Sequence, residues 1–301
     1  KNDRNIFLNM VAKADIFIQN FSPTTVTKLS IDSSSLKSIN PRLICCDISG
    51  YGEAPEMMKK KSYDLLIQAE SGLIDVSGSP EGLGRIGVSI CDIGAGMAAH
   101  AGIVESLLLR ERFNKVKDVK ISLFDVAADW MTVPYIHSKY GGAAPKRVGL
   151  KHPSIAPYGA FRCSENTSFI ISIQNELEWK RFCVEVLKTP TLLKENKFSS
   201  NTLRVKNRDL LDKTIQTILL SLTDETLKNR LEEASIAYGR LNSVKDLERH
   251  LALKKITVRN SLDDNLTIPS PPLVWENSEK KAPKFNQHNG QLRKEFNDTK
   301  K

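Results

Sequence analysis

Apolar residues recur at two different spacings along this chain of 301 residues. Up to about residue 150, short apolar runs typical of strands alternate with stretches whose apolar residues fall on one face of a helix. The predicted elements are strand Asp15–Gln19, a short helix closing at Leu36–Asn40, strand Leu43–Ile48, helix Tyr63–Ser71, a helix from about Ile93 to Arg112, and strand Val119–Leu123 running into a helix. Such alternation indicates a parallel sheet with helices on both faces.

The pattern changes after Gly141-Gly142. The stretches KHPSIAPYGAFRC and SFIISIQ predict a small antiparallel unit, and three helical segments follow at Glu176–Leu187, Asn207–Leu220 and Thr223–Ala234. We therefore predict an α/β protein with a Rossmann-like large domain at residues 1–145 and a smaller α+β domain at 146–255. The segment 256–301, with short strands and prolines, is expected to return to the large domain.

The composition is that of an ordinary soluble globular protein, with 40% hydrophobic and 26% charged residues. No apolar run is long enough to span a membrane, and the opening KNDRNIFLNMVAKADIFIQNF is not a signal peptide. The chain begins with Lys1 rather than Met, and its first segment already has the pattern of a helix running into a strand. We therefore expect a further segment to precede it.

Five cysteines lie without metal-ligand spacing, which favours a reduced cytoplasmic protein over a zinc site or a disulfide framework. Two of them, Cys45 and Cys46, are neighbours in one strand and should point to opposite faces. The net charge of +9 comes from 44 basic and 35 acidic residues. Because the lysines form no stripe interleaved with aromatic residues, we expect no nucleic-acid partner, while anionic small ligands fit.

The stretch RIGVSICDIGAGMAAHAGIVESLLLRER carries the most informative carboxylate, Asp92. The predicted helix starts directly after Asp92, where free N–H groups and the helix dipole stabilise an anion. Small residues follow, so a large ligand has room to approach the backbone. A carboxylate in such a place is a candidate nucleophile toward an acyl group, and the alternative is a structural N-cap.

Eight fragments, taken in order, resemble family III CoA-transferases, the group that includes formyl-CoA transferase, carnitine CoA-transferase and α-methylacyl-CoA racemase. They are ADIFIQNFSP, LKSINPRLICCDISGYG, YDLLIQAESGLIDVSG, GVSICDIGAGMAAHAGIVESLLLRER, VKISLFDVA, HPSIAPYGAF, NTLRVKNRDLL and ASIAYGRLNSVKDL. Together they span nearly the whole chain. The family's opening βαβ segment has no counterpart here, in agreement with the expectation that a segment precedes Lys1.

The resemblance implies an acyl-CoA:carboxylate CoA-transferase with Asp92 as nucleophile, working through anhydride and enzyme–CoA thioester intermediates. It implies no permanently bound cofactor and no metal, since coenzyme A enters as the acyl-CoA substrate. The implied partners are an acyl-CoA donor, a small carboxylate acceptor and a second copy of the chain in an intertwined homodimer.

Tyr63 and Asp64 distinguish the branches of the family that the chain resembles. Racemases of the family carry a histidine at the position matching Tyr63, whereas transferases carry tyrosine followed by an acidic residue. Tyrosine is a poor base near neutral pH but a suitable hydrogen-bond donor to an oxyanion. We therefore assign catalytic roles to both residues. A tyrosine that merely packs, and an Asp64 that only caps its own helix, are the structural alternatives. A racemase-type isomerase and a catalytically silent CoA-binding protein are the functional ones.

The resemblance also assigns four CoA contacts. Asn20 matches the NF-x-P loop, and Lys28, Arg42 and Lys61 match basic positions of the family. Many relatives have arginine where Ser22 stands, which removes one expected phosphate contact. For each basic residue the alternative is a solvated surface charge.

Overall fold

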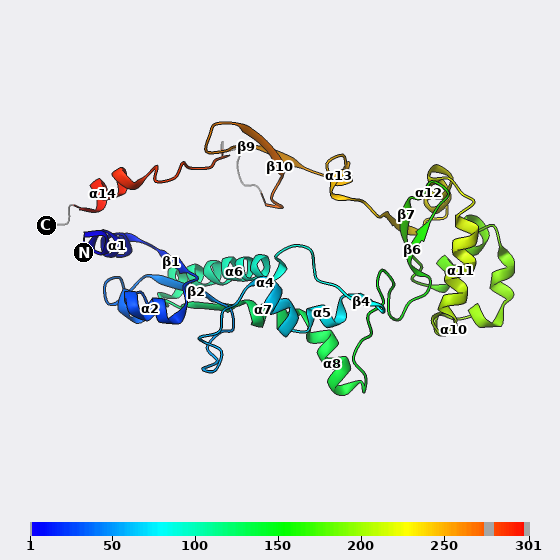
Figure 1. Ribbon diagram of the computed structural model, residues 1–301, viewed down its shortest axis with the longest axis horizontal. Coiled ribbons are helices and arrows are strands. Elements are labelled where there is room, and N and C mark those ends of the chain that lie inside the picture. Colours follow the sequence, from blue (N-terminus) through cyan, green and yellow to red (C-terminus); the bar gives the residue numbers. More distant parts are fainter. Residues whose placement is uncertain (1, 274–279, 298–301) are drawn as a thin grey trace. The chain divides into compact units, whose positions relative to one another are not determined.

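The computed structural model describes residues 2–273 and 280–297, and the chain forms two compact units. Of the described residues, the first unit takes in 2–145, 258–266 and 280–297, and the second takes in 146–257 and 267–273. Figure 1 shows the order of the elements along the chain. Each unit has its own apolar core, so each is described separately below.

The centre of the first unit is a three-stranded parallel sheet in the order β1-β2-β5. Its strands are β1 (Ile16–Gln19), β2 (Ile44–Ser49) and β5 (Val119–Ser122). In register, Ile16 lies opposite Ile44, and Cys46 lies opposite Val119. β-branched and other apolar residues dominate these segments, as expected for strands covered on both faces.

Helices cover both faces of this sheet. One face packs against α1 (Asn2–Lys13), α2 (Pro23–Leu29) and α3 (Ser33–Lys37), and the other packs against α6 (Ile90–Phe113). Cys45 belongs to the first cluster of buried residues, whereas Cys46 belongs to the second, with Ala99 and Ile103 of α6. The predicted opposite orientation of the two cysteines is therefore confirmed, as is the parallel α/β sheet.

Helix α6 begins earlier than the sequence pattern predicts, at Ile90 instead of about Ile93. Asp92 is therefore the third residue of the helix and not the residue that precedes it. Further along, a Cβ added to Gly94 would lie 2.4 Å from the Trp130 ring. The missing side chain lets α7 (Leu123–Trp130) pack closely on the first turns of α6.

Several shorter elements complete this unit, including a helix that the sequence pattern did not predict in the C-terminal segment. They are α4 (Asp64–Glu70), α5 (Leu73–Val76), the hairpin β3 (Gly78–Ser79) and β4 (Gly82–Leu83), α8 (Thr132–Tyr140), and α14 (Asn289–Asn297). Helix α14 lies beside α1, where Asn9 Nδ2 donates to the Phe296 carbonyl at 2.8 Å and Arg293 pairs with Asp3 (Figure 1).

The C-terminal segment of the chain also contains a small sheet in the order β10-β9-β11. Its strands are β9 (Lys255–Arg259), β10 (Asn265–Pro269) and β11 (Lys280–Lys281).

The second unit combines an antiparallel sheet with helices, which confirms its predicted α+β character. The sheet runs β6 (Tyr158–Arg162), β7 (Ser168–Ser172) and β8 (Ala237–Arg240). The α-helices are α9 (Glu176–Arg181), α10 (Asn201–Lys206), α11 (Arg208–Leu219), α12 (Asp224–Glu233) and α13 (Val244–Leu247). The predicted helix Glu176–Leu187 is α-helical only to Arg181 and continues as a π-helical turn over Phe182–Val186. Short 3₁₀ turns follow at Pro190–Lys194 and Asn196–Phe198.

Candidate functional site

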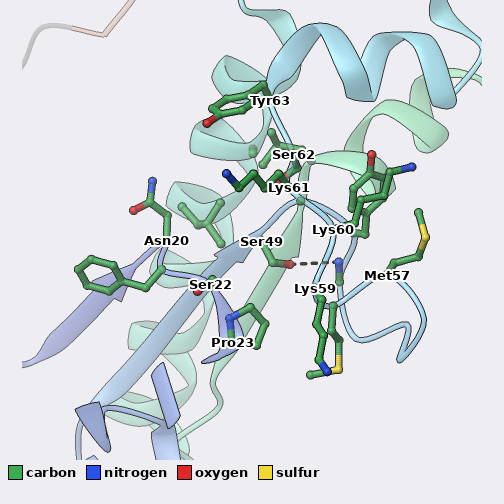
Figure 2. Close-up of a pocket in the computed structure, with 18 of the residues that line it drawn as sticks. Asn20, Ser22, Pro23, Ser49, Met57, Lys59, Lys60, Lys61, Ser62 and Tyr63 are labelled. Carbon is green, nitrogen blue, oxygen red and sulfur yellow. Dashed lines mark hydrogen bonds between the residues drawn. The ribbon is translucent and has the colours of Figure 1, made fainter. Parts of the chain in front are cut away.

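A cavity of about 960 Å³ lies in the first unit, at the carboxyl ends of β1, β2 and β5. This edge of a parallel sheet is where α/β proteins hold their ligands. The lining comes from the turn after β1, the end of β2, the segment 57–63, the first turns of α6, and Leu123 (Figure 2). Five stretches that are separate in the sequence therefore meet at one site.

The turn after β1 is held by a buried amide, Gln19, which is 8% exposed. Its Nε2 donates to Asp47 Oδ1 at 2.7 Å, and its Oε1 accepts from the Phe21 N–H at 2.6 Å. Next in the chain, Ser22 caps α2, and its Oγ accepts from the Thr25 N–H at 3.4 Å. These bonds fix the turn carrying Asn20, which lines the cavity.

The opposite wall is held against β2 by a close approach at Gly50. A Cβ at Gly50 would lie 2.0 Å from Ser62 Oγ, so only glycine leaves room for this contact. Beside it, Ser49 Oγ accepts a hydrogen bond from the Gly52 N–H at 3.1 Å, drawn dashed in Figure 2. The segment with three consecutive lysines and Tyr63 therefore runs along the cavity.

The three lysines, Lys59, Lys60 and Lys61, have different surroundings. Lys60 forms an ion pair with Glu70 at 2.5 Å, and its ammonium lies 5.2 Å from the centre of the Tyr51 ring. Among the residues that the structure describes, Lys59 and Lys61 have no ion-pair partner. Figure 2 shows the Lys61 side chain extending toward Asn20, below Tyr63. Two unpaired ammonium groups on one wall attract an anionic ligand.

Asp92 lies in the first turn of α6 and lines the cavity, together with Ala95 and Gly96 of the next turn. Its side chain is exposed, and no described residue gives it a hydrogen bond or an ion pair. Partial removal from water raises the pKa of Asp92 above its ordinary value, and the negative charge of Asp64 raises it further. Tyr63 also lines the cavity and is 69% exposed.

Asp64 does not line the cavity; it is buried, with 8% of its surface exposed. Its Oδ1 accepts from the Cys91 N–H at 2.7 Å, and its Oδ2 accepts from Gln68 Nε2 at 2.6 Å. The residue before α6, Ser89, makes no side-chain cap. Asp64 therefore caps α6 and not its own helix, which corrects the structural alternative inferred from the sequence. This cap at Cys91 also explains why α6 starts earlier than the sequence pattern predicts.

Lys28 and Arg42 lie outside the cavity lining. Lys28 is an exposed residue in the last turn of α2. Arg42 Nη1 donates to Asn114 Oδ1 at 2.9 Å, and its Nη2 pairs with Glu111 at 3.1 Å, both near the C-terminal end of α6. The structure therefore brings Asn20, Lys61, Tyr63 and Asp92 to one cavity and leaves Lys28 and Arg42 outside it. The CoA contacts predicted at Asn20, Lys28, Arg42 and Lys61 stay predictions.

Sequence reasoning missed two other features of this site. Lys59 lines the cavity, and its signal was the run MMKKKSY, in which only Lys61 was selected. Gln68 has no signal in the sequence, because its hydrogen bond with the Ile86 backbone joins two segments that are 18 positions apart.

The described residues include no group of histidine, cysteine and carboxylate side chains arranged to hold a metal ion. All five cysteines are buried and unpaired. None of the described helices has the length and apolar character needed to cross a membrane.

The fold and the site define an α/β protein that presents a free carboxylate and unpaired lysines to a ligand at the carboxyl ends of a parallel sheet. The sequence comparisons then identify the family. The chain belongs to CoA-transferase family III, whose sequence model matches residues 1–289. The family assignment and the prediction of a CoA-transferase enzyme are thereby confirmed.

Several relatives carry more specific names. The acetyl-CoA:oxalate CoA-transferase of Acetobacter aceti is 30% identical, over 98% of this chain and 77% of the relative. The succinate–glutarate CoA-transferase of Agrobacterium fabrum is 25% identical, over 94% and 72%. The succinyl-CoA:glutarate CoA-transferase of Mus musculus is 29% identical, and the match covers 80% of this chain but 55% of the mouse protein. The crystal structure of a CaiB/BaiF family protein from Brucella suis superposes with a TM-score of 0.83 at 28% identity, over 97% of this chain and 78% of that one.

The raised pKa of Asp92 predicts that neutralising this residue stabilises the protein. A raised pKa in the folded state means that folding disfavours the ionised carboxylate, and the penalty is complete above that pKa. We expect Asp92→Asn to raise the urea midpoint at pH 7, with a gain that shrinks as the pH falls through the pKa of Asp92. Asp129→Asn, at an exposed position outside the cavity, is the control. A lower midpoint for Asp92→Asn at pH 7 would contradict the raised pKa.

Proposed function

We propose that this protein transfers coenzyme A from an acyl-CoA to a small carboxylate, with Asp92 as the nucleophile. The observation that carries the proposal is an exposed, unpartnered carboxylate in the first turn of α6, in the same cavity as Lys59 and Lys61. The names of the relatives support the same reaction class.

The reaction proceeds by four acyl transfers that conserve atoms and charge. An oxygen of Asp92 attacks the thioester carbonyl, which forms a mixed anhydride and releases the CoA thiolate. The thiolate attacks the aspartyl carbonyl, which releases the donor carboxylate and leaves an aspartyl–CoA thioester. The acceptor carboxylate attacks this thioester, which forms a second anhydride and releases the CoA thiolate. The thiolate then attacks the acceptor's carbonyl in that anhydride. Asp92 is regenerated, and the acceptor leaves as its CoA thioester.

The other residues of the cavity divide between binding and stabilisation. Tyr63, which is exposed and lines the same cavity as Asp92, donates its hydroxyl proton in a hydrogen bond to the oxyanion of each tetrahedral intermediate. Asn20 and Lys61, with Lys59, hold the anionic part of CoA. Lys28 and Arg42 lie outside the cavity, so they contact CoA only where it extends beyond the lining. Asp64 acts on the reaction through α6, as a positioning residue.

Asp92→Ala tests the nucleophile. We expect turnover to fall by about 10³-fold or more, because the covalent route is lost. Mass spectrometry of the wild-type protein incubated with an acyl-CoA should show a covalent adduct, with the mass of CoA less that of water, on the peptide containing Asp92. The matched control is Asp129→Ala, which removes an exposed carboxylate outside the cavity. Near-normal turnover of Asp92→Ala, or an adduct on another peptide, would refute the assignment.

The racemase-type alternative requires a second base besides Asp92, and Tyr63 stands where racemases of the family carry a histidine. We therefore expect no deuterium to enter the α-position of a 2-methylacyl-CoA in heavy water, as measured by mass spectrometry. Incorporation at a rate comparable to CoA transfer would favour the isomerase. CoA binding without adduct or turnover would instead favour the catalytically silent binding protein.

We further propose that the protein forms a homodimer. Helix α6 carries large exposed apolar side chains at helical spacing, namely Ile93, Met97, Val104 and Leu108, and α8 carries Val133, Tyr135, Ile136 and Tyr140. Surfaces of this kind are typical of protein–protein interfaces. Sedimentation equilibrium at micromolar concentration should give twice the chain mass, and Leu108→Glu should shift the protein toward monomer while the control Glu105→Gln does not. A monomeric wild-type protein would contradict this proposal.

The five unpaired thiols are consistent with the proposed cytoplasmic location, where cysteines stay reduced.

A further inference from the structure

The hydrogen bonds around Asp64 continue to a second buried side chain, Gln68, which lies one turn further along α4 and is 1% exposed. Gln68 Nε2 donates to Asp64 Oδ2 at 2.6 Å. At its other end, Gln68 Oε1 accepts from the Ile86 N–H at 3.0 Å, and a weaker bond runs from Nε2 to the Ile86 carbonyl at 3.4 Å. One amide therefore joins the carboxylate that caps α6 to the backbone that leads into α6.

The direction of each bond in this network is fixed by chemistry. An ionised carboxylate only accepts hydrogen bonds, so Asp64 takes one from the Cys91 N–H and one from Gln68. Gln68 must therefore turn its NH₂ group toward Asp64, which leaves its oxygen for the Ile86 N–H. Turning the amide over would place two acceptors against each other at one end and two donors at the other.

We propose that Gln68 is a positioning residue for the reaction at Asp92. By holding one oxygen of Asp64, it directs the other oxygen to the Cys91 N–H and so fixes the first turn of α6, in which Asp92 is the next residue. The inference rests on the proposed function, in which Asp92 reacts. Because a reacting group must be placed within fractions of an ångström, the loss of this restraint acts on the chemical step more than on binding.

A pair of substitutions that exchanges amide and carboxylate tests the network. Gln68→Glu places two carboxylates against each other, and Asp64→Asn places two NH₂ groups together. In the double variant the asparagine NH₂ donates to the glutamate, the asparagine oxygen still accepts from Cys91, and the second glutamate oxygen accepts from Ile86. The net charge is unchanged, and only the weaker bond to the Ile86 carbonyl is lost.

We expect each single variant to lower kcat by about 10-fold or more, with the KM for acyl-CoA changed by less than about threefold. The double variant should recover kcat to within about threefold of the wild type. Amide hydrogen exchange at Cys91 should accelerate in the single variants and return toward the wild-type rate in the double one. Ala69→Glu, which adds an exposed carboxylate to α4 outside the network, is the control.

Three results would overturn the inference: unchanged kcat in both single variants, a double variant as impaired as the single ones, or a loss of kcat that only follows the folded fraction seen in thermal unfolding. A wild-type protein without turnover would overturn this inference together with the proposed function. Wild-type turnover with unaffected single variants would overturn the inference alone.

Discussion

The hydrogen bond from the Cys91 N–H to Asp64 fixes the start of α6, and the geometry of the site depends on it. Helix α6 is 24 residues long, and Asn114, which follows its last residue, adopts the left-handed conformation. At its other end, free N–H groups need acceptors, and Ser89 supplies none from its side chain. The buried carboxylate of Asp64, from α4, supplies the acceptor instead. Burying this carboxylate without hydrogen-bond donors would cost free energy. The two helices are therefore tied together at the residue next to Asp92.

The same bond separates the roles of two neighbouring carboxylates. Asp64 is buried and accepts two hydrogen bonds, so its charge is balanced by donors. Asp92 has no such partner among the described residues, and its pKa is raised, first by partial removal from water and then by Asp64. A carboxylate of raised pKa is more basic and holds its proton more strongly, so it is also the stronger nucleophile once ionised. The structural carboxylate thus makes the exposed one more basic and, in the proposed reaction, a stronger nucleophile.

The sequence was sufficient to predict what depends on local pattern. The parallel strands, the opposite orientation of Cys45 and Cys46, and a carboxylate at the N-terminal end of a helix all follow from apolar spacing and residue type. The predicted start of α6 was about three residues too late, because the side chain that caps the helix belongs to Asp64, 27 positions before Cys91. Contacts between distant segments leave no periodic signal. The bond of Gln68 to Ile86, the approach of Ser62 to Gly50 and the packing of α14 on α1 belong to this class.

The pairing of charges is also set by contacts between distant segments. A net charge of +9 therefore does not tell which cations are available to a ligand. Arg42 is paired with Glu111, and the middle lysine of the run, Lys60, is turned toward Glu70 and the Tyr51 ring. Three consecutive like charges repel one another, and pairing the middle one reduces this repulsion. Lys59 and Lys61 then line the cavity without an ion-pair partner among the described residues. The attraction of an anion therefore comes from local pairing, which only the folded chain determines.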